Sequence, residues 1–304
     1  MESSSGADKA ALERSYSAPP RLDPTIAAAL LTGVKAILDT SGVTFFLRQG
    51  TCLGAIRDNR FIAWDDDIDI GSIIGLHGVT ESTIDSSVTA FEEDGYFVER
   101  TEGEDYIGIS MIKASTRIDW TCYRIVDGTI YHYPGMRIPA SLFVELKEID
   151  FVGTKFLVPD PPEDYLRLKY GAEWMIPKED GFEDDVFELV PDAPTRGGRD
   201  WLTRVIGKYV VRAGGGRIRV LDPEGRPVGG TEVNVGGICR SMTNKLGYAS
   251  VHLPRDDWYA VLIEHGDHRE LLYQEKLTRT ATYVYRPDPL VSTGRLCVLS
   301  EGTS

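Results

Sequence analysis

Phe61-Ile-Ala-Trp-Asp-Asp-Asp-Ile-Asp-Ile70 is the stretch on which the interpretation of the whole chain depends. Its apolar residues predict a strand, and alternate side chains of a strand share a face, so Asp65, Asp67 and Asp69 would point the same way. Carboxylates packed side by side repel one another and raise each other's pKa. A divalent cation held by their oxygens would supply the missing positive charge.

A solvated acidic loop is the more common meaning of such a run, and this alternative applies here as well. Two features favour a metal site, because the run lies among apolar residues and follows the glycine-rich segment Arg48-Gln-Gly-Thr-Cys-Leu-Gly-Ala-Ile-Arg57. Residues 51–57 are expected to form a short helix after a strand at 43–47, and its N-terminus offers backbone N–H groups to a phosphate. Together the two segments indicate metal-dependent phosphoryl or nucleotidyl transfer.

A further aspartate, Asp119, lies between two apolar residues inside a strand predicted at 116–126. A buried carboxylate without a partner is costly, so this residue needs one. One interpretation is a salt bridge with a neighbouring Arg or Lys. The other is that Asp119 lies beside Asp67 and Asp69 and completes a metal triad.

Composition limits the class of protein. The chain has 304 residues and 33.7 kDa, which favours two domains. A net charge of -14 and a pI near 4.9 disfavour nucleic acid polymers as partners. No apolar run is long enough to predict a membrane span, and the N-terminus lacks the apolar core of a secretion signal. The four scattered cysteines are typical of free thiols in a reducing compartment, so we expect a cytoplasmic protein.

The composition and the expected secondary structure change along the chain. We expect a disordered N-terminus at 1–22, a catalytic domain at 23–195, a linker at 196–216, a β-sandwich at 217–287 and a tail at 288–304. The catalytic part is expected to hold a helix that is capped by Asp23 and stops at Gly42, a second helix at 81–94, and three strands of one antiparallel sheet, with a hairpin turn at Asp127-Gly128. After residue 217, short strands alternate with turns, which is typical of a small β-sandwich.

The catalytic segment resembles the LicD family, which includes fukutin-related proteins and is a branch of the polymerase-β-like nucleotidyltransferase superfamily. The resemblance covers about residues 25–178 and runs through Gly50 to Arg57, Phe61 to Asp69, Ile118-Asp119, and the segment 161–177 with Tyr165-Leu166, Tyr170-Gly171 and Trp174. It implies an α+β protein with a polymerase-β-like nucleotidyltransferase fold, followed here by a small C-terminal all-β sandwich domain.

The resemblance also implies an activity. This is the transfer of a phospho-alcohol, such as phosphocholine or a polyol phosphate, from a CDP-linked donor to a glycan hydroxyl of a cell-surface polysaccharide such as a capsule or teichoic acid. In that scheme Asp67, Asp69 and Asp119 are catalytic and bind Mg²⁺, or Mn²⁺ in its place. The residues expected to bind substrate are Gly50, Thr51, Arg57, Trp64, Asp66 and Tyr170.

Some features depart from the family. Arg48-Gln49 precedes the glycine where members have smaller or acidic residues, Val144-Glu-Leu-Lys147 replaces Phe-Pro-Leu-Lys, and the cysteine-rich zinc insert of animal members is absent between Asp69 and Asp119. Two other functions remain open. One is a nucleotidyltransferase that modifies a protein or small molecule, and the other is a non-catalytic nucleotide-binding module. The second domain resembles carboxypeptidase regulatory-like or transthyretin-like sandwiches, for which we expect a glycan partner, a protein partner or a passive stabilising role.

Overall fold

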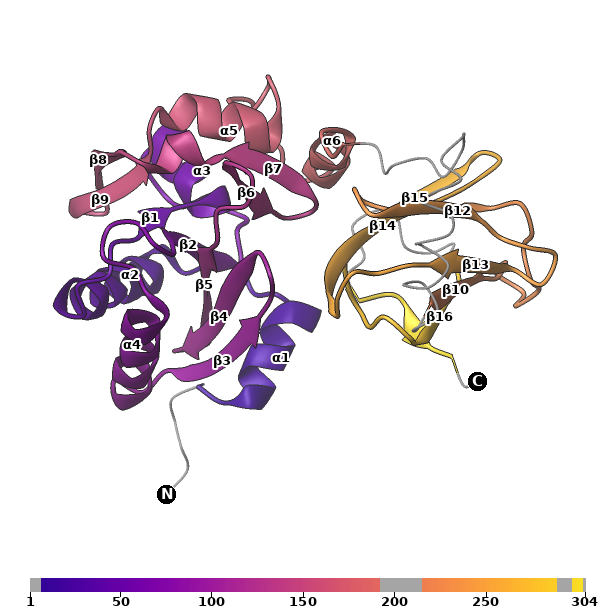
Figure 1. The fold of residues 1–304 in the computed structure, drawn as a ribbon, viewed down its shortest axis with the longest axis horizontal. Helices are drawn as coiled ribbons and strands as arrows, with labels where there is room; N and C mark the ends of the chain where they lie inside the picture. Colours follow the sequence, from indigo (N-terminus) through magenta and orange to yellow (C-terminus); the bar gives the residue numbers. More distant parts are fainter. Residues whose placement is uncertain (1–6, 192–214, 289–296, 303–304) are drawn as a thin grey trace. The chain divides into compact units, whose positions relative to one another are not determined.

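The computed structural model describes residues 7–191, 215–288 and 297–302 (Figure 1). The chain divides into two compact units. The N-terminal unit comprises residues 1–132 and 137–177, and the C-terminal unit comprises 133–136 and 178–304. This division falls after Pro177, whereas we expected the catalytic domain to continue to residue 195. Each unit is described by itself.

A five-stranded sheet forms the centre of the N-terminal unit, in the order β1-β2-β5-β4-β3. Its strands are β1 (Phe46–Leu47), β2 (Asp67–Ile73), β3 (Phe97–Glu102), β4 (Tyr106–Lys113) and β5 (Thr116–Tyr123). Strands β3, β4 and β5 form the expected antiparallel meander, and β1 is antiparallel to β2. The pairing of β2 with β5 is parallel, and it joins the acidic stretch to the strand that carries Asp119.

The two faces of this sheet differ in chemistry. Ile68 and Ile70 of β2 and Ile118 and Trp120 of β5 are fully buried in one apolar core, together with residues of α2 (Pro24–Thr40) and α4 (Glu81–Glu93). Because side chains alternate along a strand, the charged residues of β2 and β5 lie on the opposite face. That face carries α1 (Lys9–Ser17), which contacts β4 and β5 (Figure 1).

Helix α1 corrects the expectation that residues 1–22 are disordered. The side chain of Asp8 accepts a hydrogen bond from the backbone N–H of Ala11 and so caps the helix. Ala11 and Leu12 are buried, and they pack with Ile112 of β4. The apolar residues in this segment are few, so its stability comes from packing against the sheet, which the composition of the segment did not reveal.

The acidic strand starts later than expected. Strand β2 begins at Asp67 and continues to Ile73, whereas residues 61–66 form a turn and irregular structure. Asp65 therefore does not share the strand geometry of Asp67 and Asp69. Phe61 is buried and packs edge-to-face on Phe151, which fixes this segment to the core without a strand.

The remaining elements of this unit surround the sheet. They are α3 (Gln49–Asp58), β6 (Thr129–His132), β7 (Met136–Pro139), the 3-10 helix η1 (Ala140–Phe143), β8 (Leu146–Phe151), β9 (Thr154–Pro159) and α5 (Pro162–Tyr170). Asp23 caps α2 as expected, with Pro24 at its first turn. The predicted turn at Asp127-Gly128 is present, with φ of 50° and 72°, as a type I′ turn requires.

The C-terminal unit contains α6 (Phe182–Glu188) and two four-stranded sheets, in the orders β13-β10-β16-β17 and β12-β11-β14-β15. The strands are β10 (Gly216–Val220), β11 (Glu232–Val235), β12 (Cys239–Met242), β13 (Tyr248–Val251), β14 (Asp257–His265), β15 (His268–Leu277), β16 (Thr282–Tyr285) and β17 (Ser300–Glu301). Buried residues of both sheets share one apolar cluster. Phe187 of α6 packs on Leu262 and Leu271, which explains why this helix belongs to the C-terminal unit.

Two expected segments fall wholly or partly outside the described residues. Most of the expected linker at 196–216 lies in the undescribed segment 192–214, although residues 216–220 form β10. Within the expected tail at 288–304, Ser300 and Glu301 pair with β16. Among the helices in the described ranges, none is long and apolar enough to cross a membrane.

Candidate functional site

The parallel pairing of β2 with β5 brings the candidate carboxylates together. In its register Asp69 lies opposite Asp119, and Asp67 lies opposite Arg117. All four side chains are on the face that does not contribute to the apolar core. Asp119 therefore lies beside Asp69, as the metal-triad interpretation predicts. We call Asp65, Asp66, Asp67, Asp69 and Asp119 together the acidic centre.

Arg117 connects three members of the acidic centre. Its guanidinium Nη2 lies 2.8 Å from Asp66 Oδ2 and 2.5 Å from Asp67 Oδ2, and its Nε lies 3.1 Å from Asp119 Oδ2. The Arg117 side chain is 5% exposed, so these ion pairs are shielded from water. Asp119 thus has the arginine partner that the salt-bridge interpretation predicts, and it also has neighbouring carboxylates.

Asp69 has a different set of partners. Arg48 Nη2 lies 2.8 Å from Asp69 Oδ1, and the side-chain amide of Gln49 donates to the same oxygen at 3.2 Å. The Asp69 backbone N–H donates to the Thr51 hydroxyl at 2.8 Å. Lys169 of α5 also interacts with Asp69. Burial lowers the pKa of Lys169 to about 7, and the negative charge of Asp69 partly opposes this effect. Two buried basic side chains thus face this one carboxylate.

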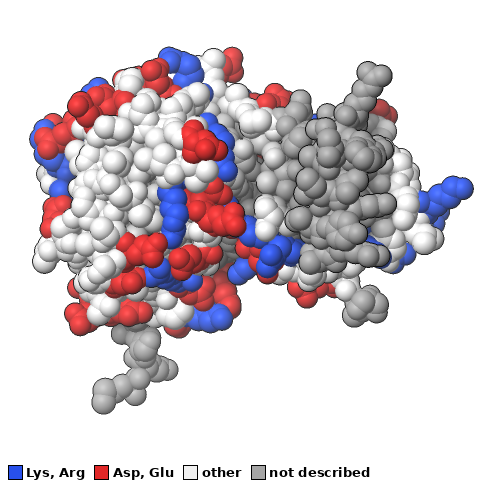
Figure 2. Space-filling view, viewed as in Figure 1, with Lys and Arg blue, Asp and Glu red and all other residues white. Residues whose placement is uncertain are grey.

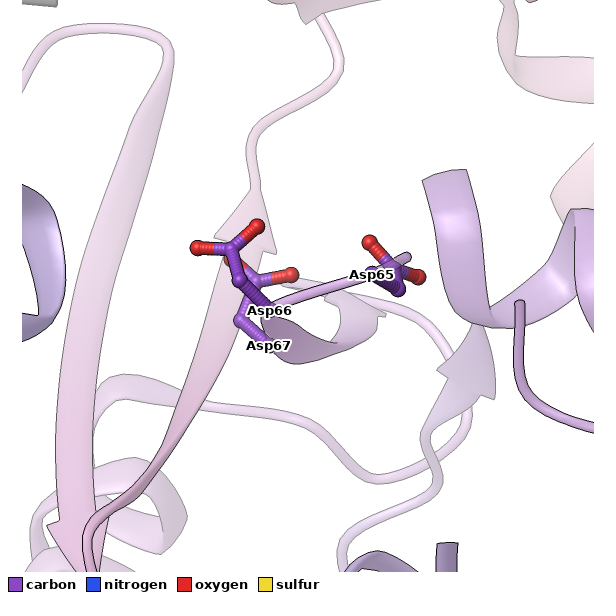
Figure 3. Close-up of side chains that lie close together, drawn as sticks. All are labelled: Asp65, Asp66 and Asp67. Atoms are coloured by element: carbon purple, nitrogen blue, oxygen red, sulfur yellow. The ribbon is translucent and has the colours of Figure 1, made fainter. Parts of the chain in front are cut away.

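The Asp65 carboxylate has fewer hydrogen-bond partners than that of Asp69. Its Oδ2 atom is buried and has no hydrogen-bond partner. One carboxylate oxygen from each of Asp65, Asp66 and Asp67 lies within 4.8 Å of the others, which is close enough for a shared cation (Figure 3). A buried carboxylate oxygen without a donor is expensive unless a cation or proton occupies it.

Proton affinities in the acidic centre are raised. Burial, with the negative charge of Asp67 as a further contribution, raises the pKa of Asp65 and Asp119. The same causes raise the pKa of Asp66 to about 6 and that of Asp69 to about 8. These directions mean that the nearby basic residues do not fully neutralise the carboxylates.

Helix α3 begins beside the acidic centre. A Cβ on Gly50 would lie 2.5 Å from Asp65 Oδ2, so a larger residue here would displace the Asp65 carboxylate. The helix has no side-chain cap at Arg48, and the first N–H, that of Gln49, donates to Tyr165 Oη at 2.9 Å. The positive end of the helix dipole therefore points toward the carboxylates and toward any phosphate bound among them.

The other expected substrate-binding residues are spread more widely. Arg57 lies in the last turn of α3, about 10 Å along the helix axis from Gly50, and it pairs with Asp58 at 2.7 Å. The Thr51 side chain is fully buried against β2. Trp64 and Tyr170 are half-buried, and the Tyr170 ring lies 5.7 Å from Lys169 Nζ. The structure thus brings Gly50, Thr51 and Asp66 to the acidic centre and places Arg57 at the far end of its helix.

Sequence reasoning missed Arg117, Lys169 and Tyr16 as members of the site. Arg117 had a readable signal, because it stands two residues before Asp119 and must therefore share its face. Lys169 and Tyr16 had none, since each reaches the site through the packing of a helix that is distant in sequence.

On the face shown in Figure 2, acidic and basic side chains are interspersed, and the basic side chains that are visible form no continuous surface.

Part of the chain matches a known protein family. Residues 42–161 match the family described as LicD/FKTN/FKRP, nucleotidyltransferase domain. The ribitol 5-phosphate transferases FKRP of Homo sapiens and Mus musculus are each 25% identical over 146 residues, which is 45% of this chain and 30% of each relative. The chain thus matches less than a third of the length of these relatives.

Two solved structures of the antibiotic-resistance factor ANT(2'')-Ia are also similar. The solution structure has a TM-score of 0.37 at 16% identity and covers 55% of this chain and 83% of that chain. The crystal structure with adenylyl-2''-tobramycin has a TM-score of 0.34 at 18% identity and covers 53% and 86%.

Proposed function

Because residues 42–161 form a nucleotidyltransferase domain of the LicD/FKTN/FKRP family, we propose that this protein is a phosphotransferase whose reaction takes place at the acidic centre. It transfers a phospho-alcohol, such as phosphocholine or a polyol phosphate, from a CDP-linked donor to a glycan hydroxyl in cell-surface polysaccharide synthesis, for example of a capsule or teichoic acid. The observation that carries the proposal is the pairing of Asp69 with Asp119 across β2 and β5, beside the N-terminus of α3.

The charges of the site fit a divalent cation. The acidic centre has five carboxylates, and the buried basic side chains that face it are those of Arg48, Arg117 and Lys169. With all groups ionised, two negative charges remain. Mg²⁺, or Mn²⁺ in its place, carries that charge and prefers oxygen ligands. The partnerless Oδ2 of Asp65 supports the same conclusion, since a cation is one of the few groups that could satisfy it.

In the proposed mechanism Asp67, Asp69 and Asp119 would hold the cation, whose positive charge would offset the negative charge of the donor diphosphate. The backbone at the start of α3 binds phosphate oxygens, and Gly50 lets the diphosphate approach closely. The acceptor oxygen bonds to the transferred phosphorus while the bond between that phosphorus and the bridging oxygen breaks, and CMP leaves. Asp119 accepts the acceptor's proton. Positioning and charge neutralisation carry such an in-line displacement.

The released nucleotide tests this reaction. The full chain is incubated with Mg²⁺, a glycan or polyol acceptor, and in turn CDP-ribitol, CDP-glycerol and CDP-choline, and the products are separated by mass. The proposal expects CMP and an acceptor heavier by the phospho-alcohol. Release of pyrophosphate from CTP, with the nucleotide kept on a protein or small molecule, would support the alternative nucleotidyltransferase instead. No turnover of any donor, together with nucleotide binding, would support a non-catalytic module.

Magnesium binding is expected to tighten as the pH rises from 6 to 8. The cation binds deprotonated carboxylates, and the pKa of Asp69 is raised to about 8, so below that pH the ion must displace a proton. One displaced proton strengthens apparent affinity by about tenfold per pH unit until the group is ionised. Calorimetry in two buffers of different protonation enthalpy would measure the released proton. Asp69→Asn should flatten the dependence, and a wild-type affinity that is independent of pH would contradict the prediction.

The C-terminal unit offers a separate place for a ligand, and we propose that it binds a glycan. A cavity of about 520 Å³ is lined by apolar residues and by the polar or charged residues Asp222, Thr231, His265, His268, Arg269, Glu270, Tyr285 and Asp288. His268 Nε2 and the Tyr285 hydroxyl are 2.7 Å apart, and Tyr285 donates to Glu270. The Thr231 hydroxyl is buried without a partner. Polar side chains beside apolar ones in the same cavity suit the hydroxyls and C–H faces of a sugar.

Calorimetry with soluble oligosaccharides from the acceptor polymer tests the cavity. Thr231→Val and Tyr285→Phe are each expected to weaken binding about fivefold, since one hydrogen bond contributes about 1 kcal/mol. Equal binding by these variants and the wild type would exclude the cavity and leave a protein partner or a stabilising role. We also propose a cytoplasmic location, which the four free cysteines support.

A further inference from the structure

Helix α1 covers the face of the sheet on which the acidic centre lies. The backbone carbonyl of Ser15 accepts a hydrogen bond from Arg117 Nη1 at 2.8 Å. The Tyr16 ring lies against the same guanidinium, with the Arg117 Cζ atom 4.3 Å from the ring centroid. The last turn of α1 therefore contacts the residue that links three of the carboxylates.

The hydroxyl of Tyr16 reaches the proposed general base. It donates to Ser110 Oγ at 2.8 Å and lies 3.3 Å from Asp119 Oδ1. Ser110 is directly opposite Asp119 in the β4–β5 register, so its hydroxyl is fixed beside that carboxylate. The other oxygen of Asp119, Oδ2, is 3.1 Å from Arg117 Nε. Both oxygens of the base are thus engaged by other side chains.

We propose that the acceptor's hydroxyl binds at the position that the Tyr16 hydroxyl holds here, with Ser110 and Asp119 as its partners, and that α1 withdraws to admit it. This inference rests on the proposed function, because it names the acceptor part of the same site. It adds Ser110 as a residue that touches substrate and Tyr16 as an internal competitor of the acceptor.

Of Tyr16 and Arg117, which both contact the Asp119 carboxylate oxygens, Tyr16 is the one that the acceptor displaces. An incoming alcohol offers Ser110 and Asp119 the same O–H donor that the tyrosine offers, so their contacts with Tyr16 can be replaced, and the hydrogen bond from Arg117 to the Ser15 carbonyl is the one that is lost. Displacing Arg117 would instead uncover three carboxylates at once. The same negative surroundings favour a neutral acceptor, such as a sugar or polyol hydroxyl, over an anionic group.

The attachment of α1 permits this movement. The helix has nine residues and buries Ala11, Leu12 and Ser15. A short helix held by few apolar contacts opens at a far lower cost than the whole domain unfolds. Arg117 and Asp119 belong to β5 in the middle of the sheet, so they stay in place when α1 leaves.

Tyr16→Phe and Ser110→Ala separate the acceptor subsite from a structural role. Tyr16→Phe keeps the ring on Arg117 and removes the competing hydroxyl. With CDP-ribitol as donor and glycerol as a simple acceptor, we expect it to lower the KM for glycerol about threefold to tenfold without lowering kcat, and to speed hydrolysis of the donor by water. Ser110→Ala should raise the KM for glycerol by a similar factor. Tyr96→Phe is the matched control, because it removes a largely buried tyrosine hydroxyl elsewhere in the same unit.

Hydrogen exchange gives a second readout that does not depend on turnover. Glycerol, added with Mg²⁺ and CDP-ribitol, should accelerate exchange of residues 9–17 in the wild type. A fall in kcat for Tyr16→Phe with an unchanged KM would overturn the inference in favour of a positioning role for Tyr16. Exchange of 9–17 that does not respond to glycerol would overturn it too, whether or not CMP is released. Absence of wild-type turnover with every CDP donor refutes the proposed function separately.

Discussion

Replacing Asp67 by Asn is expected to lower turnover of a CDP-linked donor about 10³-fold while leaving the fold intact. Asp67 belongs both to the triad with Asp69 and Asp119 and to the cluster with Asp65 and Asp66, so either way of holding the cation loses a ligand. A bound metal contributes several kcal/mol of charge stabilisation in the transition state, and each 1.36 kcal/mol is worth a factor of ten. The measurement is CMP release at saturating donor and Mg²⁺, with the melting temperature recorded alongside.

Asp94→Asn serves as the control, because this half-exposed carboxylate of the same unit pairs with Lys113 at the end of α4. Its turnover should equal that of the wild type. Asp65→Asn and Asp69→Asn then distinguish the two sets of ligands, since the variant that weakens Mg²⁺ binding more identifies the set in use. Wild-type turnover in Asp67→Asn would remove the acidic centre from the mechanism.

Replacing Arg117 by Met is expected to destabilise the metal-free protein by about 3–5 kcal/mol, which is the usual cost of leaving a buried charge without its partner. Here the single change leaves Asp66, Asp67 and Asp119 without their shared guanidinium. Methionine fills similar space, so the loss reflects charge more than packing. Urea unfolding with and without Mg²⁺ measures both parts of the prediction.

Magnesium should restore more stability to Arg117→Met than it adds to the wild type. The cation then replaces the lost positive charge, and a ligand that binds the folded state stabilises it by mass action. Arg137→Met is the matched control, since Arg137 pairs with Asp105 but is 43% exposed, and its loss should cost less than about 1 kcal/mol. Equal effects of Mg²⁺ on the stability of the two variants would show that the cation does not bind where the Arg117 guanidinium lies.

The sequence allowed the pairing of the key carboxylates to be predicted because simple alternation governs strands. Asp69 and Asp119 each stand between fully buried apolar residues, so each had to face away from the core, and the structure places them opposite one another. The helix after Asp23 and the turn at Asp127-Gly128 followed from equally local chemistry. These are the parts of the site where nearest neighbours in sequence determine the geometry.

Parts that depend on packing between distant segments were not predictable. The start of the chain was expected to be disordered because it is polar, yet Leu12 finds an apolar site on β4 and brings Tyr16 to Asp119. Asp65 was assigned to a strand, whereas it lies in irregular structure before β2 and faces Gly50. Lys169 lies about a hundred positions from the acidic stretch, and no periodicity links the two.

The parallel pairing of β2 with β5 also sets when the site forms during folding. Asp67 and the arginine that holds it are 50 residues apart, and no tight turn can join parallel strands. The β3–β4–β5 meander closes through short loops and forms first, whereas docking of β2 must wait for a longer loop to close. Repulsion between Asp119 and the carboxylates of the acidic stretch therefore opposes this docking step. On the ribosome, a nascent chain can bring Asp69 beside Asp119 only after β5 has left the exit tunnel.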